Sequence, residues 1–382
     1  MRIVYVTTSL KSKDFDIFNS FWSTPLNTSN QTFNNKMIRC LALDQTNEII
    51  VISLRPYTSA CSLKKMPYSC ASQGNITFHY LKVRKNKILR YFSFRSSAKK
   101  YIDEADLIVS ETINRSCIDL ACHLKDVTGL PLVGILTDNP YNISFVNDSY
   151  SRKLVELGSK CDAFITLTDK LYELYCPTKD KPSFKLIGLS EDELEKVNVI
   201  PEHKKFFYFG GALLKRYGVY ELIEAFKQIS NQDVRLVISG HHPEKDLEKV
   251  IKSDKRIRYV KAIPNKYALN IEALSVANIN PRPYQSDLDQ YSIPSKIIEY
   301  IASGNLTISM KNNELHDLLK DDILWVEDSS VSSLKKQMEA ALKMSPAQKN
   351  KMTSKAKKKI KELTSLSNVS PRIQKFLLSL KK

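Results

Sequence analysis

Short apolar runs, rich in β-branched and aromatic side chains, recur along the chain and alternate with longer stretches of helical periodicity. In the first half, these runs occupy residues 3–6, 49–54, 76–81, 107–109, 132–136 and 163–167. In the second half, they occupy residues 206–209, 234–239, 257–260, 277–280, 306–309 and 324–326. The helical stretches include residues 33–43, 116–125, 219–229 and 293–302. Strands that alternate with helices predict parallel sheets built from βαβ units, so we expect an α/β protein.

A charged stretch that contains Pro201 separates the two series of runs. The pattern therefore predicts two Rossmann-like domains facing one another across a cleft. The predicted parts are residues 1–198, residues 199–365 and a C-terminal helical segment, 366–382. Ser370 and Pro371 suit the cap and first position of this last helix, which is expected to pack back toward the first domain. In open α/β sheets, ligands bind beyond the carboxyl ends of the strands, so the loops there are candidate sites.

The chain is long and basic, with 382 residues and a formal net charge of +17. An excess of cations favours an anionic partner, such as nucleic acid, anionic lipid or a phosphate-bearing substrate. The seven cysteines include no CxxC pair and the six histidines lack metal-ligand spacing, so we expect a reducing cytoplasm and no bound metal. The first residues have the pattern of a strand rather than a signal peptide. No segment has the ~18 apolar residues that span a membrane.

One segment combines a potential anion site with a carboxylate. Residues 280–304, NPRPYQSDLDQYSIPSKIIEYIASG, run from a predicted strand through a polar loop into a helix that opens near Pro294. Pro is favoured at the first helical position, and the amides there point into the loop, where a phosphate would bind. Ser295 and Glu299 lie on one face of this helix. Amides for phosphates and a carboxylate for ribose hydroxyls suit a nucleotide, although a Glu near a helix start is also simply favourable there.

A second segment, GGALLKRYGVYELIEAF (210–226), directly follows a predicted strand. Gly210 and Gly211 permit close backbone approach to a ligand and unusual dihedral angles. Lys215 and Arg216 follow in the loop, and a further glycine precedes the helix. A glycine pair and a basic pair between a strand and a helix form a phosphate-binding arrangement, although a Gly-Gly pair also occurs in ordinary turns.

Together, the two segments resemble the donor domain of the retaining GT-B glycosyltransferases of family 4. Members of that family have a similar order of elements. A strand ending in Gly is followed by a loop with basic residues and a helix ending in Ala-Phe, and later comes a Pro-Ser-Lys-x-x-Glu-Tyr helix closed by Ser-Gly. The chain carries PSKIIEYIASG at 294–304, and the NPRP before it resembles bacterial polysaccharide-forming members. The likeness covers residues 205–310 well, whereas the first half shares only the layout expected of an acceptor-side domain. It implies a GT-B fold, a nucleotide-sugar donor and no bound divalent metal.

The resemblance also implies roles for individual residues. Glu299 matches the second Glu of the family's E-x7-E motif and would bind the ribose of the donor. The first Glu of that motif would fall at Tyr291, which cannot supply a carboxylate, so this chain departs from the family at the reacting centre. Further contacts to the donor are expected from Gly210, Gly211, Arg282, Tyr291, Ser292, Ile293 and Ser295.

Lys215 and Arg216 occupy the loop where the family places its diphosphate-binding Arg and Lys. Neither is in strict register, because Tyr217 replaces the usual Lys before the helix glycine. Either Lys215 or Arg216 is expected to stabilise the leaving diphosphate, since fixed cations and amides offset the negative charge that builds there.

In the first half, Asp138 follows the predicted strand at 132–136. A carboxylate there suits a polar contact or a general base, and the family commonly has His or Asp at a similar place. Asp-Asn-Pro also starts ordinary turns, so both interpretations stay open. Weaker candidates, for which capping and turns are the alternatives, are Asn27, Ser29, Asn34, Thr168 and Asp169. The pair His241–His242 would border the nucleotide base or lie exposed.

Residues 82–100, KVRKNKILRYFSFRSSAKK, hold eight basic residues and no acidic one, interleaved with aromatic side chains. Such a segment is typical of membrane-surface binding, where each cation near an anionic leaflet contributes about 1 kcal/mol. No nucleic-acid motif accompanies it, so we expect no nucleic-acid partner. A second basic stretch, 349–361, is more simply a solvated helix face.

The sequence therefore predicts a glycosyltransferase of hexosyltransferase type. It would move a sugar from a UDP- or GDP-linked donor, with retention, to a carbohydrate, lipid-linked acceptor in cell-surface polysaccharide or glycoconjugate synthesis. The donor is a co-substrate, no cofactor is expected, and the enzyme would be cytoplasmic or peripheral on the inner face of the cell membrane. The alternative is a non-catalytic, basic two-domain protein that binds a nucleotide sugar or another anion, for which Tyr291 leaves room. The absence of GxGxxG after the first strand disfavours a dinucleotide-dependent enzyme.

Overall fold

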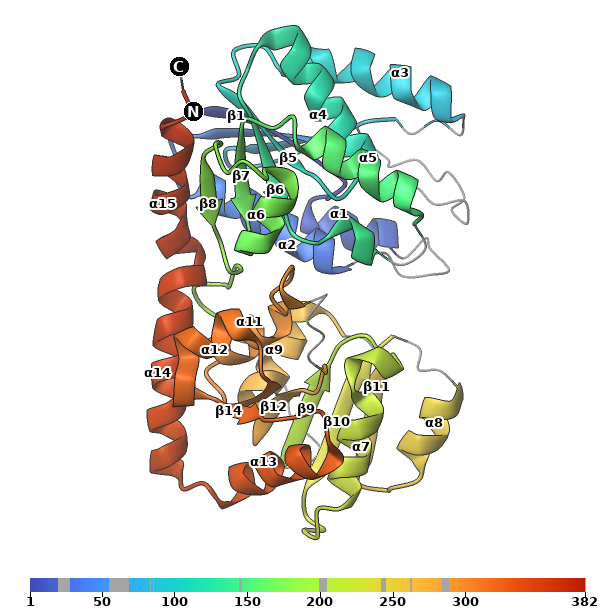
Figure 1. The fold of residues 1–382 in the computed structure, drawn as a ribbon, viewed down its shortest axis with the longest axis vertical. Coiled ribbons are helices and arrows are strands. Elements are labelled where there is room, and N and C mark those ends of the chain that lie inside the picture. The colour runs from blue at the N-terminus through green and yellow to red at the C-terminus, as the bar shows by residue number, and fades with distance from the viewer. Residues whose placement is uncertain are drawn as a thin grey trace. The chain divides into compact units, whose positions relative to one another are not determined.

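The computed structural model divides the chain into two compact units, each with one β-sheet and helices packed on it (Figure 1). The structure describes residues 1–19, 28–54, 69–82, 84, 86–143, 146–198, 205–241, 245–261, 263–283 and 289–381, without the side chains of Asn19 and Lys87. Unit 1 comprises Met1–Leu189 and Leu366–Lys382, and unit 2 comprises Ser190–Ser365. The division thus follows Leu189, whereas the sequence pattern placed it after residue 198.

The sheet of unit 1 has eight strands among the described residues, in the order β3-β4-β2-β1-β5-β6-β7-β8. The strands are β1 (Arg2–Thr7), β2 (Glu48–Ser53), β3 (Cys70–Gln73), β4 (Ile76–Tyr80), β5 (Leu107–Glu111), β6 (Leu132–Leu136), β7 (Ala163–Thr166) and β8 (Ser183–Lys185). Neighbouring strands are parallel except for β3 and β4. Every apolar run predicted in the first half forms a strand. The hydrophobic pattern missed β3 and β8, because both are short and mostly polar or exposed.

Helices cover both faces of this sheet (Figure 1). They are α1 (Ser12–Asn19), α2 (Thr28–Ala42), α3 (Lys87–Ala98), α4 (Arg115–Thr128), α5 (Asp148–Gly158), α6 (Asp169–Tyr175) and α15 (Leu366–Leu378), with 3-10 turns η1 (Lys99–Tyr101) and η2 (Pro140–Asn142). Side chains alternate along each strand, so Ile3 and Tyr5 join the core under α1, α2 and α15 while Val4 faces the other way.

The last helix begins earlier than its sequence predicts. We expected Ser370 and Pro371 to open it, but α15 begins at Leu366 and contains Pro371 in its interior. A proline within a helix costs about 3 kcal/mol. Burial of Leu366 and Ile373, together with two further apolar side chains of the same stripe, outweighs that cost at about 1.5–3 kcal/mol each. The stripe packs into the core of unit 1, beside α2.

The sheet of unit 2 has six strands among the described residues, all parallel, in the order β11-β10-β9-β12-β13-β14. The strands are β9 (Phe206–Gly210), β10 (Arg235–Gly240), β11 (Ile257–Lys261), β12 (Ala277–Asn280), β13 (Thr307–Met310) and β14 (Leu324–Val326). All six were predicted from the second series of apolar runs. Both sheets thus have the Rossmann-like α/β layout that the sequence predicts.

The helices of unit 2 are α7 (Val219–Lys227), α8 (Lys245–Lys252), α9 (Asn265–Leu274), α11 (Ser295–Ala302), α12 (Asn313–Leu319), α13 (Val331–Lys343) and α14 (Pro346–Thr364), with 3-10 turns η3 (Lys215–Tyr217) and η4 (Lys320–Asp322). Helices α7, α8 and α13 share one core with the sheet, whereas Tyr300 of α11 packs on its other face with Phe206 and Tyr208. Pro294 is the N-cap of α11 rather than its first helical residue, one position from the prediction.

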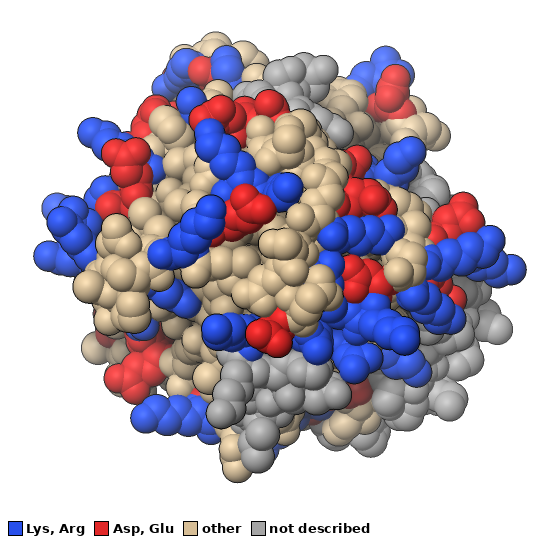
Figure 2. Space-filling model, turned by 90° about the horizontal axis from the view of Figure 1, so that it is seen from below, with Lys and Arg blue, Asp and Glu red and all other residues tan. Residues whose placement is uncertain are grey.

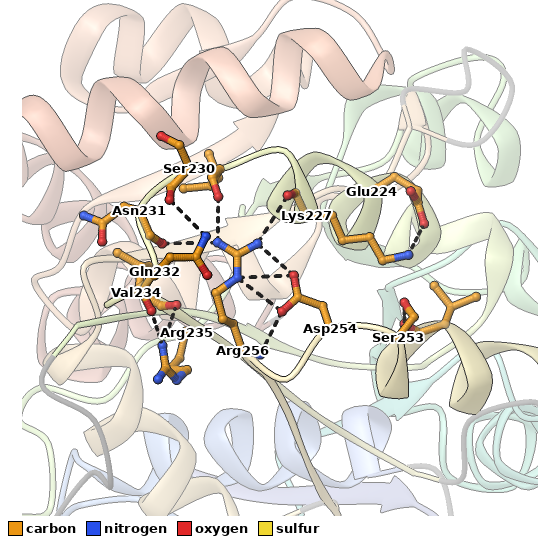
Figure 3. A network of polar contacts seen from close by, with 12 residues as sticks. Glu224, Lys227, Ser230, Asn231, Gln232, Val234, Arg235, Ser253, Asp254 and Arg256 are labelled. Carbon is orange, nitrogen blue, oxygen red and sulfur yellow. Dashed lines mark hydrogen bonds and ion pairs between the residues drawn. The ribbon is translucent and has the colours of Figure 1, made fainter.

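A buried arginine fixes the connection between α7 and β10. The guanidinium of Arg256 donates to the carbonyls of Ile229, Asn231 and Lys227, at 2.6, 3.1 and 3.2 Å, just after α7 ends (Figure 3). Its Nη2 also lies 2.7 Å from Asp254 Oδ2. These bonds satisfy carbonyls that a helix end leaves unpaired. They hold α7, whose other end carries the candidate phosphate loop.

Each sheet has one point at which the strand order reverses. In unit 1, the chain builds from β1 toward β2 and β4, and then returns to the other side of β1 with β5. In unit 2, it builds from β9 toward β10 and β11, and returns to the other side of β9 with β12. Ligands of open α/β sheets bind outside the carboxyl ends of the strands at such switch points. The two candidate regions are therefore the carboxyl ends of β1 and β5, and those of β9 and β12.

Candidate functional site

The carboxyl ends of β9 and β12 bring together the two segments that carried the predicted chemistry. The backbone N–H of Gly210 donates to Tyr300 Oη at 3.0 Å, and Tyr300 is fully buried. Tyr300 follows Glu299 on α11, so this bond fastens the PSKIIEY helix to the start of the glycine loop. Burial, and then the carboxylate of Glu272, raises the pKa of Tyr300 well above its ordinary value, so its hydroxyl stays protonated.

Gly210 and Gly211 are required by packing rather than by unusual dihedral angles, which corrects one of the two expectations for them. Neither has a positive φ. A Cβ at Gly210 would lie 2.7 Å from the hydroxyl of Tyr208, and one at Gly211 would lie 3.3 Å from the ring of Phe209. The N–H of Gly211 donates to the Ser239 carbonyl at 2.9 Å. The loop therefore leaves β9 pressed against its own strand and against β10.

The glycine that precedes α7 does adopt the left-handed conformation. Gly218 has φ 73°, and a Cβ there would lie 2.0 Å from the carbonyl oxygen of Pro281, which follows β12. The two loops therefore touch through their backbones. As the N-cap of α7, Gly218 supplies no capping side chain, so the positive end of this helix is not neutralised by a side chain at its cap.

The basic side chains of the two loops meet around one tyrosine. Lys215 and Arg216 form η3 and are exposed. The guanidinium carbons of Arg216 and Arg282 lie 5.2 and 5.9 Å from the centre of the Tyr217 ring. Arg282 Nη2 lies 3.1 Å from Oδ1 of Asp289, a carboxylate that is 5% exposed. The structure thus places Arg282 beside the loop that was predicted to bind the diphosphate.

The residues before α11 lie partly or fully within the protein. Ile293 is buried, Tyr291 and Ser292 are half-buried, and Ser295 is exposed. The Ser292 N–H contacts the carbonyl of Asp289 at 3.5 Å. Pro294 provides no side-chain cap, and its carbonyl accepts the Ile297 N–H at 3.0 Å.

Glu299 lies on the second turn of α11 with an 11% exposed side chain, and its carboxylate is 3.6 Å from Nζ of Lys296. Its charge acts on the buried hydroxyls of this region. Burial first, and then the carboxylates of Glu272 and Glu299, raise the pKa of Tyr208. Glu299 directly precedes Tyr300, whose hydroxyl is bonded to Gly210 at the end of β9.

In unit 1, the candidates that follow β6 and β7 differ in what they do. Asp138 is exposed, and the turn after it is capped by its neighbour, since Asn139 Oδ1 accepts the N–H of Tyr141 at 3.0 Å. Thr168 caps α6 by accepting the Leu171 N–H. Asp169 pairs with Lys185. Thr168 thus has the capping role that was its alternative, and Asp169 forms an ion pair instead.

Sequence reasoning missed the most densely hydrogen-bonded carboxylate of unit 1. Glu111 ends β5 and is 2% exposed. It accepts the Thr8 N–H at 2.6 Å, Asn30 Nδ2 at 2.8 Å and Asn34 Nδ2 at 3.3 Å. The Cys117 thiol lies 3.2 Å from Glu111 Oε1, the oxygen that also accepts the Thr8 N–H, and burial keeps the pKa of that thiol well above its ordinary value. An acidic residue directly after an apolar run, at 107–111, is the signal that could have indicated it.

Polar side chains in the first half of α2 bond to β1 and to the chain that follows it. Asn34 Oδ1 accepts the Tyr5 hydroxyl at 2.7 Å, and Gln31 Oε1 accepts the Ser9 hydroxyl and the Leu10 N–H. Asn34 therefore has a structural role, and Ser29 is exposed. Asn27 lies outside the described residues.

The remaining candidates are the pair His241–His242 and the basic stretch 349–361. His241 is exposed, and His242 lies outside the described residues. On α14, Lys349 donates to the Val276 carbonyl at 2.8 Å and Lys359 pairs with Asp322 at 2.6 Å. Part of the basic stretch 349–361 thus anchors the helix instead of only solvating it. On the face shown in Figure 2, Lys and Arg side chains are interspersed with Asp and Glu.

Within the described part of the chain, no group of three or more His, Cys, Asp or Glu side chains is arranged to hold a metal ion. Among the same residues, no helix combines the length and apolar character needed to cross a membrane.

Comparison with solved structures establishes the fold. Sucrose-phosphate synthase from Thermosynechococcus elongatus is 12% identical, with a TM-score of 0.73, covering 100% of this chain and 99% of its own. Anabaena HepE in complex with UDP-glucose is 13% identical, with a TM-score of 0.67 and coverages of 99% and 100%. α,α-Trehalose 6-phosphate synthase from Burkholderia multivorans is 12% identical, with a TM-score of 0.66 and coverages of 100% and 98%. The two Rossmann-like sheets are therefore those of the GT-B fold.

The family comparison concerns the second unit. Residues 190–359 match the family model described as glycosyl transferases group 1. The matched part of the chain contains both the glycine loop and α11. No curated protein matches the chain.

Proposed function

We propose that this protein is a glycosyltransferase that moves a hexosyl group from a nucleotide-sugar donor to a carbohydrate acceptor, with retention of configuration. One observation carries the proposal: the glycine loop and the Glu299 helix of the group 1 domain are joined at the switch point of the unit 2 sheet, through Tyr300 and Gly210. UDP is the preferred carrier, since the structures similar to this chain include HepE bound to UDP and to UDP-glucose.

The roles follow from the chemistry of each group. The uncapped amides at the starts of α7 and α11, with the backbone of Gly210 and Gly211, suit the diphosphate. Glu299 would accept the ribose hydroxyls. Arg216 or Lys215 would stabilise the diphosphate as the bond from the sugar to its phosphate oxygen breaks.

On the acceptor side, Asp138 is the candidate base that would take the proton of the attacking hydroxyl. Tyr291, Ser292, Ile293, Ser295 and Arg282 would line the donor. A lipid-linked acceptor, polysaccharide or glycoconjugate synthesis, and membership of family 4 belong to the same proposal, because they follow from the resemblance of the NPRP and PSKIIEY segments. No cofactor besides the donor is proposed.

The test is incubation with a panel of UDP- and GDP-sugars, following donor hydrolysis and transfer to lipid-linked saccharides. Turnover should fall by a factor of 100 or more in Glu299→Ala and in Arg216→Ala, as when one transition-state contact is removed. Glu339→Ala and Lys336→Ala, on α13, are matched controls that should keep wild-type rates. Nuclear magnetic resonance of the product reports the anomeric configuration.

Tyr291 favours the alternative, a non-catalytic protein that binds a nucleotide sugar, because it lacks the carboxylate that the family has at that position. Binding of UDP-sugars without turnover across the whole panel, with acceptors present, would support this alternative and exclude the enzyme. Failure to bind any nucleotide would exclude both.

The proposed acceptor requires access to a membrane, and helix α3 offers a surface of the right chemistry. Phe94 and Ala98 are buried, and Arg95 pairs with Asp119 of α4 at 3.2 Å, so one side of α3 is anchored. The other side exposes large apolar residues: Ile88 at 67%, Leu89 at 56%, Phe92 at 62% and Tyr91 at 39%. Exposed cations flank them at Lys82, Arg84, Lys99 and Lys100. We propose that this face binds the surface of an anionic leaflet.

Sedimentation with phosphatidylglycerol vesicles tests this binding, with phosphatidylcholine vesicles for comparison. The triple variant Ile88→Ser, Leu89→Ser, Phe92→Ser should lose binding. The same change at Val127, Tyr267 and Leu274, which are exposed elsewhere, should preserve it. Binding should weaken as salt rises. If neutralising the cations of residues 82–100 left vesicle binding unchanged, this surface would not be the docking site.

A further inference from the structure

The contacts around Arg282 point to a positioning function for Asp289 and Tyr217, two residues of the predicted donor-binding segments. Asp289 is 5% exposed, and its Oδ1 lies 3.1 Å from Arg282 Nη2. Arg282 itself is 23% exposed, so its guanidinium has access to solvent while its partner does not. A buried carboxylate paired with a partly exposed guanidinium fixes the orientation of the exposed group.

Tyr217 supplies the second constraint. Its ring is half-buried against the core of unit 2 and lies within cation–π distance of Arg216 and of Arg282. The loop that carries Tyr217 packs directly against the loop after β12, because Gly218 allows the backbone to approach the Pro281 carbonyl closely. The ring thus holds guanidiniums from two different loops near one another, at the uncapped start of α7.

The pairing leaves Arg282 able to bind a phosphate. A guanidinium carries five N–H donors in a planar fork, and in the ion pair with Asp289 the terminal nitrogen Nη2 lies 3.1 Å from the carboxylate. Arg is also suited to this task because its planar fork matches phosphate oxygens in a way that the ammonium of Lys cannot. Two cations held on one ring suit the two phosphates of a nucleoside diphosphate.

We propose that Asp289 and Tyr217 are positioning residues that hold Arg282 and Arg216 as a pair for the diphosphate of the donor. Tyr217 stands where the resembled family has a lysine. In this chain the second cation comes instead from the loop after β12, oriented by the buried carboxylate. This inference rests on the proposed function, since it assigns the groups that bind the diphosphate of the same donor.

The test compares the affinities of the intact protein for uridine and for UDP. Asp289→Asn should weaken UDP binding about tenfold, the loss expected when a charge-assisted contact is released, and leave uridine binding unchanged. Tyr217→Leu should act in the same direction, and Tyr217→Phe should keep wild-type affinity because it keeps the ring. An overall structural effect would change uridine and UDP binding alike.

A double-mutant cycle separates positioning from direct contact. If Asp289 acts through Arg282, then adding Asp289→Asn to Arg282→Gln should change UDP affinity no further than Arg282→Gln alone. Additive losses would overturn the proposal, and so would tighter UDP binding in Asp289→Asn, which would show that the carboxylate competes with the phosphate.

Two further outcomes keep the test decisive. If Asp289→Asn does not fold, Arg282→Lys keeps the ion pair but loses the planar fork, and should still weaken UDP binding relative to uridine; an unchanged ratio would overturn the proposal. If the wild-type protein binds no UDP, the proposed function fails. If it binds UDP and the variants bind it equally well, only this inference fails.

Discussion

The two switch points of this protein differ in the groups that make their contacts. At the carboxyl ends of β1 and β5, side chains are joined to one another around the buried carboxylate of Glu111. At the carboxyl ends of β9 and β12, glycine backbone makes the contacts: the Gly210 N–H donates to the Tyr300 hydroxyl, and Gly218 lies against Pro281. The polar groups around Glu111 are hydrogen-bonded to one another. The loops after β9 and β12, by contrast, carry the basic side chains of Lys215, Arg216 and Arg282. We therefore expect substitutions in the first to act on stability, and those in the second on nucleotide binding.

The largest effect is expected at Glu111. Glu111→Ala should lower the free energy of unfolding of unit 1 by about 3 kcal/mol, because it removes the buried carboxylate that accepts from Thr8, Asn30 and Asn34. Hydrogen exchange in β1 and α2 measures this. Glu104→Ala, at an 86% exposed carboxylate, is the control and should change little. Loss of UDP affinity at a temperature where Glu111→Ala is folded would contradict the contrast between the two regions.

The second largest effect on stability is expected for a substitution at Gly218. Gly218→Ala combines a left-handed residue, at about 1–2 kcal/mol, with a clash against Pro281, at about 1–3 kcal/mol. Gly129→Ala provides a close match, because Gly129 has the same φ of 73° but nothing within 4 Å of the added Cβ. Thermal unfolding should show the larger loss for Gly218→Ala, and only that variant should lose UDP binding. Equal losses would show that the contact between the two loops contributes nothing.

A smaller effect is expected at Tyr300. Tyr300→Phe removes the hydroxyl that accepts the Gly210 N–H, and leaving a buried donor unpaired costs about 1–2 kcal/mol. The variant should also bind UDP more weakly, because the start of the glycine loop is released. Tyr172→Phe is the control: its hydroxyl donates to the Lys181 carbonyl of unit 1 at 2.6 Å. Calorimetric titration with UDP distinguishes the two.

The smallest effect is a pH dependence away from both switch points. The Arg256 guanidinium, which donates to both oxygens of Asp254, holds the pKa of that carboxyl below its ordinary value of 3.8 (Figure 3). A lowered folded-state pKa stabilises the protein above the ordinary value, and the contribution is lost as pH falls below about 4 through the folded pKa. Asp254→Asn should therefore flatten the acidic part of the stability curve without changing UDP affinity at pH 7. An unaltered acid limb would show that this ion pair adds nothing.

The sequence by itself determined the six strands described in the sheet of unit 2 and all but β3 and β8 of those described in the sheet of unit 1. Buried parallel strands are continuous apolar runs, so β1, β6, β9 and β12 were evident from local composition. The same local information indicated the glycine loop and the PSKIIEY helix as candidate donor-binding segments. It failed where local signals mislead: Pro371 suggested a helix start, but the apolar stripe of α15 carries the helix through it.

Only the tertiary structure decided which of these groups meet. The bond from Gly210 to Tyr300 joins residues 90 positions apart, and the bond from Thr8 to Glu111 joins residues 103 positions apart. Periodicity reports which face of an element is buried, but not which distant backbone group a buried hydroxyl or carboxylate will bond. The network of Glu111, the contact of Gly218 with Pro281 and the pairing of Arg282 with Asp289 depend on the order of the strands. These contacts form because, in each sheet, the chain returns to the far side of the first strand of that sheet.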